Sequence, residues 1–166
     1  MEAAKSKFEI SLESGHHSQL NTLIGKWEGV ARTWFEKDVL ADESPVSGTI
    51  TSILGGRFVL HQYKGGMQGE PVEGLAIIGY SFDNQQFQTA WVDSFHMGTG
   101  ILFSEGPATA AGHAVLGSYG GSSMPEPWGW RTEIAVANEN SIIITAFNIS
   151  PEGEEAKATE VVYNRI

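Results

Sequence analysis

The sequence predicts an all-β domain: a closed antiparallel up-and-down barrel of about ten strands, with a short N-terminal helix plugging one end. Three observations lead to this fold class. Short segments of strand character follow one another from about residue 26 to the end of the chain. Most of the turns between them are too short for a parallel crossover, which needs about a dozen residues, so neighbouring strands must pair antiparallel. Closing such a meander removes both exposed edges.

The composition limits the function classes. The 166 residues fit a single domain, and the chain has no cysteine, which excludes disulfides, thiolate metal sites and cysteine nucleophiles and suits a reducing compartment. The chain has twenty acidic and ten basic residues, which gives a net charge of −10. Because phosphate binding needs clustered Lys and Arg, we expect no nucleic-acid partner.

We expect neither a secretory signal peptide nor a membrane helix. No apolar run reaches the roughly 18 residues of a membrane helix, and the opening stretch MEAAKSKFEISLES lacks the apolar core of a signal peptide. We therefore expect a cytoplasmic protein without membrane insertion. A solid barrel that acts as a protein–protein module is one alternative, in which Trp34 and Phe35 would contribute to a homodimer face.

The N-terminal part divides at about residue 15. Residues 1–15 are polar and without period, which predicts a mobile or loosely docked segment, followed by a barrel domain over residues 16–166. Within residues 16–24, Leu20, Leu23 and Ile24 form one apolar stripe at helical spacing. We expect this to be the only helical turn, and to plug one end of the barrel.

Turn residues divide the rest of the chain into strands. The expected strands are 26–35, 46–54, 57–64, 74–81, 86–94, 99–105, 113–119, 128–137, 141–149 and 156–165. Alternation along them gives faces that mix apolar and polar side chains, as a barrel with a partly polar cavity would have.

The two ends of the chain predict how the barrel closes. Gly25-Lys26-Trp27 stands at the start of the first strand, and Arg165 is the penultimate residue. The first and last strands of a closed barrel are neighbours, so the Arg165 guanidinium can lie across the Trp27 indole with about 0.5–2 kcal/mol of cation–π attraction. We assign Gly25, Trp27 and Arg165 a structural role in closure.

Several short motifs extend this pattern over nearly the whole chain. They are Leu54-Gly55-Gly56-Arg57-Phe58, Gly79-Tyr80, Trp91-Val92-Asp93-Ser94, Ser104-Glu105-Gly106 and Tyr163-Asn164-Arg165. Together with the G-x-W at residues 25–27, they resemble a bacterial calycin-like family of unknown function, related to lipocalins and fatty-acid-binding proteins. The resemblance implies the barrel but no activity. Ser81 departs from the aspartate expected after Gly-Tyr.

A barrel of this kind is expected to hold a small apolar or amphipathic molecule, namely a fatty acid, an isoprenoid or an aromatic metabolite. Phe58, Trp91 and Trp130 are the candidates for its apolar wall. An inward Arg131 would bind a carboxylate head group, as in fatty-acid-binding proteins. The alternative is an outward Arg131 paired with Glu133, which the tryptophan-rich opposite face of this strand favours.

Four further residues are candidates for the site. Tyr163 could offer its hydroxyl to the ligand, and His61 could be a pocket histidine. Asp93 is either a polar anchor beside Trp91 or the cap of the following turn. An enzyme on the same barrel, such as an isomerase, cyclase or hydrolase, would need Asp93, Glu105 or His61 enclosed beside a hydrogen-bonding partner.

Cofactor sites find little support in the sequence. Some calycin-like barrels, the nitrobindin group, bind haem through one histidine, which makes His61, His96 and His113 candidates. That group holds its ligand near the C-terminal end, where this chain has no histidine after His113, so haem is the minor alternative. We expect no metal, because His16-His17 beside Glu13 lack the spacing of a zinc site. No G-x-S-x-G, H-E-x-x-H or P-loop motif occurs.

Overall fold

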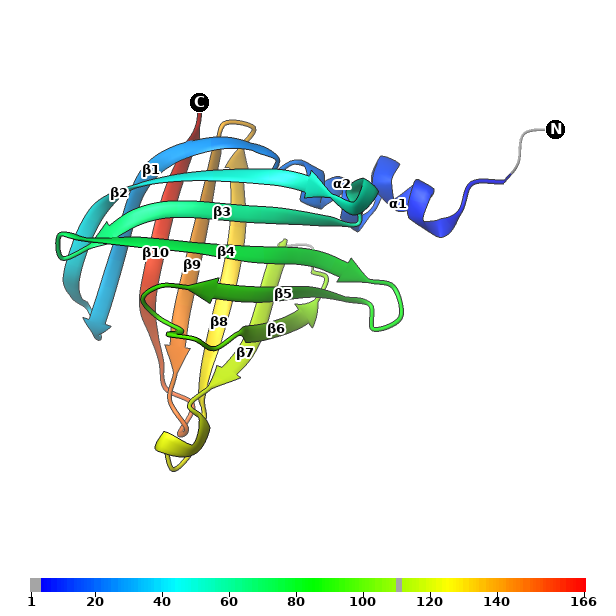
Figure 1. Cartoon of the computed structure of the whole chain (residues 1–166). Helices are drawn as coiled ribbons and strands as arrows, with labels where there is room; N and C mark the ends of the chain where they lie inside the picture. The colour runs from blue at the N-terminus through cyan, green and yellow to red at the C-terminus, as the bar shows by residue number, and fades with distance from the viewer. Residues whose placement is uncertain (1–3, 110–111) are drawn as a thin grey trace.

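The computed structural model describes residues 4–109 and 112–166, and it contains the predicted closed barrel (Figure 1). Two helices, α1 (Lys7–Ser14) and α2 (His16–Asn21), precede the strands. The strands are β1 (Gly25–Glu36), β2 (Val39–Ile53), β3 (Phe58–Met67), β4 (Glu70–Ser81), β5 (Gln86–Asp93), β6 (Leu102–Pro107), β7 (His113–Tyr119), β8 (Trp128–Asn138), β9 (Ser141–Ile149) and β10 (Glu155–Arg165). Each strand pairs antiparallel with the next, and β1 pairs with β10.

One end of the barrel is plugged by the short helix, as the sequence predicts. Leu20 in α2 and Leu23 just after it are each 3% exposed and pack with Trp27 in the barrel core. The helices lie at the end where β1 begins and β3 starts (Figure 1). We call the opposite end, which includes the β5–β6 connection at residues 94–101, the mouth.

Helix α1 is an element that the sequence analysis did not expect. Its start is fixed by a capping box, in which Ser6 Oγ accepts from the Glu9 backbone N–H at 3.2 Å and the Glu9 carboxylate accepts from the Ser6 N–H at 2.7 Å. Ser11 Oγ and His17 Nδ1, 2.8 Å apart, join α1 to α2. Hydrogen bonds rather than an apolar stripe define this helix, so the spacing of its apolar residues does not predict it. The mobility of residues 1–15 stays a prediction, and residues 1–3 lie outside the described residues.

Strand β2 is longer than expected. It begins at Val39 rather than at residue 46, after a tight turn in which Asp38 adopts a φ of 61°. The polar run at residues 42–44 and Pro45 hide this strand in the sequence, because polar residues interrupt the apolar alternation and proline is rare within sheets. The paired Arg32 and Glu43 lie opposite each other on β1 and β2 and form an ion pair there.

The contact between the first and last strands matches the sequence prediction. Trp27 lies opposite Arg165 in the β1–β10 ladder, and the guanidinium carbon is 4.2 Å from the centre of the indole. Trp27 is 1% exposed, and its Nε1 donates to the Leu23 carbonyl oxygen at 3.0 Å. Gly25 leaves room for this arrangement, because a Cβ there would collide with Arg165 Nη1.

Arg165 also donates hydrogen bonds to three backbone carbonyl groups. Its Nη1 and Nη2 reach the oxygens of Ile24 and Thr22 at 2.5 and 3.1 Å, and its Nε reaches Glu139 at 2.8 Å. One side chain therefore joins the last strand to the helical plug and to the β8–β9 turn.

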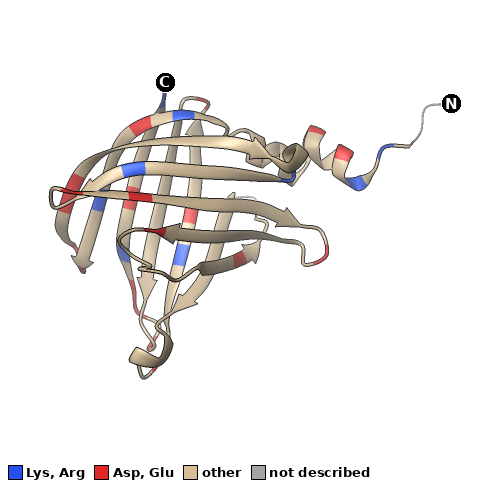
Figure 2. Ribbon diagram, viewed as in Figure 1, with Lys and Arg blue, Asp and Glu red and all other residues tan. Residues whose placement is uncertain are grey.

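The charged residues are spread along the chain rather than gathered in one element. Lys and Arg occur singly on several strands and in the N-terminal segment, with acidic residues between them (Figure 2). The described part of the chain thus shows no basic stripe of the kind that follows a phosphate backbone. Among its helices, none is long and apolar enough to cross a membrane.

Replacement of Arg165 tests the importance of this closure. We expect Arg165→Ala to lower the free energy of unfolding by about 2–4 kcal/mol, because it removes a cation–π contact and three charge-assisted hydrogen bonds. Urea denaturation followed by tryptophan fluorescence measures this. Arg131→Ala, which removes ion pairs on the outer surface, is the matched control and should cost about 1 kcal/mol or less. Equal losses in the two variants would contradict the closure role.

Candidate functional site

The barrel encloses a cavity of about 150 Å³ with a mainly apolar wall. All ten strands contribute inward side chains to it, as alternation along each strand requires. An engineered apolar cavity of about this volume holds benzene, whereas drug-sized ligands occupy pockets of about 300–1,000 Å³. The cavity therefore has the size of a single-ring molecule.

His61 and Tyr163 form a buried polar pair in the cavity wall. His61 Nε2 and the Tyr163 hydroxyl are 3.1 Å apart, and the two residues are 7% and 0% exposed. Burial lowers the pKa of His61 to about 4 and raises the pKa of Tyr163 above its ordinary value. Both side chains are consequently uncharged at neutral pH.

Two other polar side chains in the wall have no partner among the described residues. They are Thr89 through its Oγ1 and His113 through its Nδ1, and both residues are buried. Burial lowers the pKa of His113 to about 4, so its imidazole is neutral. Leaving a buried polar group unpaired costs about 1–3 kcal/mol. These two atoms are therefore the places where a guest molecule would gain most from a hydrogen bond.

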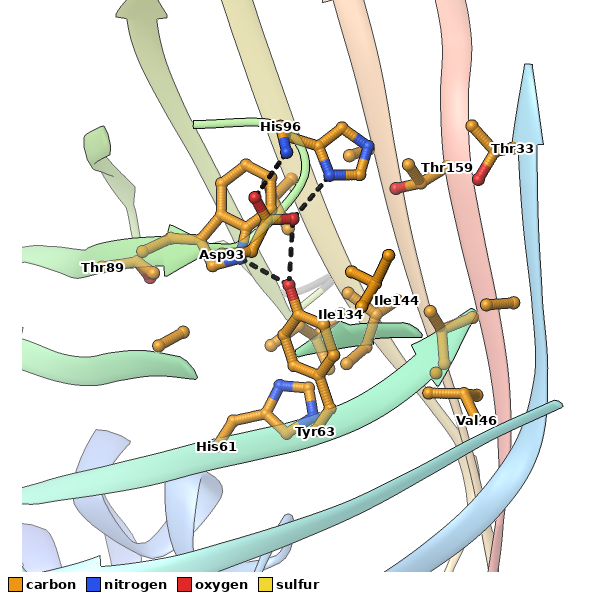
Figure 3. Close-up of a pocket in the computed structure, with 18 of the residues that line it drawn as sticks. Thr33, Val46, His61, Tyr63, Thr89, Asp93, His96, Ile134, Ile144 and Thr159 are labelled. Carbon is orange, nitrogen blue, oxygen red and sulfur yellow. Dashed lines mark hydrogen bonds and ion pairs between the residues drawn. The ribbon is translucent and has the colours of Figure 1, made fainter. Parts of the chain in front are cut away.

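Asp93 organises the mouth of the cavity (Figure 3). Its side chain is 1% exposed, and Oδ1 accepts from the backbone N–H groups of Phe95, His96 and Met97 at 3.2, 2.6 and 3.1 Å. Oδ2 lies 2.6 Å from His96 Nδ1 and accepts from the Tyr63 hydroxyl at 3.4 Å. Both sequence interpretations of Asp93 thus describe part of its environment: it caps the turn, and it faces the cavity.

The carboxyl group of Asp93 stays ionised in this position. Burial acts to raise the pKa of Asp93, but the hydrogen bond and charge of His96, together with the backbone N–H groups, outweigh burial and lower it. The negative charge of Asp93 is therefore held inside the barrel by specific donors.

Aromatic rings surround the Asp93–His96 pair. Trp91 and Trp130 stack with ring centres 5.4 Å apart and an interplanar angle of 17°, and the His96 ring is 5.5 and 5.7 Å from them. Trp91 Nε1 donates to the Tyr63 hydroxyl at 3.0 Å. Gly74 makes space for this hydroxyl, because a Cβ at that position would collide with it.

The structure brings five of the eight predicted ligand-binding residues to the cavity: His61, Trp91, Asp93, Trp130 and Tyr163. Tyr63 and His96 are the residues that sequence reasoning missed in this role. Tyr63 shares the inward face of His61 and could have been found by alternation. His96 lies in a connection without period, and only its spacing from Asp93 hints at a contact.

Two of the predicted cavity residues are corrected by the structure. Phe58 is 36% exposed and packs on the outside of the barrel over Gly79. Glu105 is also outside, where it accepts a hydrogen bond from Gln88 Nε2 at 3.3 Å. Both alternate with inward neighbours in their strands, so their register, which the sequence left open, directs them away from the cavity.

Arg131 also points outward, as the alternative interpretation held. Its guanidinium pairs with Glu133 and Glu155 and lies 4.3 Å from the centre of the Phe147 ring. Histidines aside, Arg32 is the only basic residue among the described residues of the cavity wall, and it pairs with Glu43 and Glu160. The interior therefore lacks a free cation, within the described residues, for a carboxylate head group.

Two expectations concern groups outside the cavity. In the described part of the chain, His, Asp and Glu side chains do not gather in threes as a metal site would require. Phe35, proposed for a homodimer face, stacks on Phe95 near the mouth at 6.2 Å, and both rings remain exposed. Trp34 packs under the Lys157 ammonium group. The homodimer stays a prediction.

Comparisons with known proteins agree with this fold. A family model described as Protein of unknown function (DUF1579) matches residues 13–165, and a comparison with curated proteins finds no match. Among solved structures, Rv2717c from M. tuberculosis is 10% identical with a TM-score of 0.62, over 92% of this chain and 98% of that one. The S-type phycobiliprotein lyase CPES from Guillardia theta is 9% identical with a TM-score of 0.53, over 98% of both chains. At these identities the likeness shows the fold alone.

The buried histidines predict how stability changes with pH. The folded-state pKa of His61 and of His113 is about 4, below the ordinary value of 6.5, so the unfolded chain takes up protons first as the pH falls. We expect the free energy of unfolding to fall between about pH 6.5 and pH 4, by up to about 3 kcal/mol for each histidine. Urea denaturation at several pH values measures this loss.

A single variant measures how much of this pH-dependent loss of stability comes from His113. His113→Leu should reduce the difference in unfolding free energy between pH 7 and pH 4.5 by about 2–3 kcal/mol. An unchanged difference would show that His113 does not stay neutral in the folded protein.

Proposed function

We propose a binding function for this chain, which belongs to the DUF1579 family of proteins of unknown function. In this proposal the barrel holds a small uncharged molecule of about single-ring size. The observation that supports this most directly is the enclosed apolar cavity into which two buried polar atoms, Thr89 Oγ1 and His113 Nδ1, direct unused hydrogen-bonding capacity. We also propose that the barrel is calycin-like, because its G-x-W strand pairs with a last-strand arginine.

The charges of the interior favour a neutral guest over a fatty acid. A carboxylate moved into this cavity would lose its hydration and find neutral histidines, the ionised Asp93 and an Arg32 that is already paired. A hydroxyl group, in contrast, would pair with Thr89 or His113 without bringing a charge. An aromatic metabolite is therefore favoured among the three ligand classes that the sequence suggests.

The cavity volume supports the same choice. At about 150 Å³ it is smaller than the pockets of drug-sized ligands, and an isoprenoid chain or a haem would need more space. The stacked Trp91 and Trp130 offer ring faces against which a planar guest can pack.

The structural neighbours support the proposal at the level of the fold. One neighbour with this fold is named as a phycobiliprotein lyase. Since one fold hosts many functions, the choice of guest rests on the residues of this cavity.

Binding of phenol, toluene and benzoate tests this function. We expect phenol and toluene to bind and to raise the melting temperature. Benzoate should leave it unchanged, because the described part of the cavity wall offers no free cation for the carboxylate. Thr89→Val should weaken phenol binding about fivefold, the value of one hydrogen bond of about 1 kcal/mol, without weakening toluene binding. Isothermal titration calorimetry measures both affinities.

A cavity-filling variant supplies the control. Ala76 lines the cavity and is 7% exposed, so Ala76→Leu should occupy part of the volume and abolish the binding of both rings. Wild-type protein that binds none of the three compounds, or an Ala76→Leu variant that binds them equally well, would contradict the proposed function.

A further inference from the structure

We propose that the mouth of the cavity is a proton-transfer site, where His96, positioned by Asp93, takes a proton from a small cyclic ketone held in the barrel and returns it to carbon. This inference rests on the function proposed above, because the ketone must first bind in the cavity. It assigns to the barrel an isomerase type of chemistry with a named base.

The hydrogen bond to Asp93 fixes which His96 nitrogen acts as the base. Oδ2 of the ionised Asp93 lies 2.6 Å from His96 Nδ1 and can only accept, so Nδ1 carries the proton. In a neutral imidazole the other nitrogen, Nε2, then holds the free electron pair. A base oriented by a third group in this way is the common arrangement in enzymes that move protons.

The His96 ring points across the cavity. In Figure 3 it extends from Asp93 in the direction of Thr33 and Thr159, which lie opposite each other on the paired strands β1 and β10 and line the same cavity. Within the described residues, Nδ1 is the only ring nitrogen of His96 that forms a hydrogen bond. A ketone between His96 and these threonines would meet a base on one side and hydroxyl donors on the other.

The surroundings of His96 exclude most of the solvent. Its side chain is 22% exposed and lies beside the rings of Trp91 and Trp130, which would also form the flat wall for a ring-shaped ketone. Burial lowers the pKa of the deeper histidines, His61 and His113, to about 4. His96 is thus the histidine of the cavity that has both an orienting carboxylate and an accessible nitrogen.

Turn capping alone does not explain the Asp93–His96 contact. The three backbone N–H groups of residues 95–97 all bond to Oδ1. Oδ2 is not needed for the turn, yet it faces the cavity and bonds to His96 and Tyr63. The second oxygen therefore has a separate role, which is to hold the imidazole in one orientation.

The reaction balances without a cofactor. Nε2 takes a proton from the carbon next to the carbonyl, the C–H electrons form a carbon–carbon double bond, and the carbonyl electrons move onto oxygen. The resulting imidazolium is stabilised by Asp93, and the enolate oxygen by the Thr33 or Thr159 hydroxyl. The imidazolium, which is partly exposed, then trades its proton with solvent and delivers a solvent hydrogen to the same carbon, which exchanges hydrogen. Alternatively, it delivers the proton to the far end of a conjugated system, which moves the double bond. Nothing is oxidised or reduced.

Hydrogen exchange of cyclohexanone in D₂O tests this step directly. Proton NMR follows the loss of the α-hydrogen signal, and a thermal-shift titration measures binding of the same compound. We expect the wild-type protein to accelerate exchange at least tenfold over an equal concentration of free imidazole, because a positioned general base contributes about 10²–10⁴-fold. His96→Gln should lose this acceleration and still bind cyclohexanone.

Asp93→Asn tests the positioning role. The amide oxygen of the asparagine still accepts from the backbone N–H groups and preserves the turn. The side chain is neutral, however, so His96 loses the carboxylate charge that positions it. We expect the maximal exchange rate to fall at least tenfold with the half-saturating cyclohexanone concentration unchanged, a split that a merely structural role would not produce. Glu105→Gln, which alters a carboxylate on the outer surface, is the matched control and should exchange at the wild-type rate.

Each result decides between the two proposals. Bound cyclohexanone that exchanges no faster than with free imidazole, or His96→Gln at the wild-type rate, overturns the proton-transfer site and leaves the binding function in place. Cyclohexanone that does not bind at all overturns this inference together with the ring-sized cavity on which it rests.

Discussion

The pairing of β1 with β10 is the interaction on which the rest of the structure depends. Closure of the ring gives every strand two neighbours and turns a mixed sheet face into an interior. Trp27 and Arg165 lie where the ring closes, and Arg165 extends the contact to the carbonyl groups of the plug. Without closure, His61 and Tyr163 would face water, and burial would no longer shift their pKa values. The chemistry of the cavity is therefore a consequence of how the two ends of the chain meet.

The interior combines an apolar wall with polar groups that are mostly uncharged. Burial keeps His61 and His113 neutral, whereas Asp93 remains ionised because backbone N–H groups and His96 surround it. The arginines that could have supplied a positive charge lie outside or at the edge, each paired with glutamates. Such an interior discriminates against anions by the cost of desolvation, and it leaves hydrogen bonding and ring stacking as the means of recognition.

Asp93 connects the architecture of the mouth with its proposed chemistry. One carboxylate oxygen shapes the turn that follows β5, and the other orients His96 toward the cavity. The family is described as one of unknown function, and the solved neighbours share the fold at about 10% identity. Because a barrel fold is compatible with many functions, the function of this chain is set by the placement of its own side chains.

The sequence by itself determined the strand order, the ring closure and the plug, because alternation, turn residues and the two chain ends are local or topological signals. It also favoured the outward position of Arg131. Only the tertiary structure decided that Phe58 and Glu105 face outward, since alternation separates two faces without saying which one is inside. The capping box of α1, the volume of the cavity and the meeting of Tyr63, Asp93 and His96 likewise had to come from the structure. They depend on hydrogen bonds, on how the barrel curves, and on a connection without period, and none of these leaves a repeating pattern in the sequence.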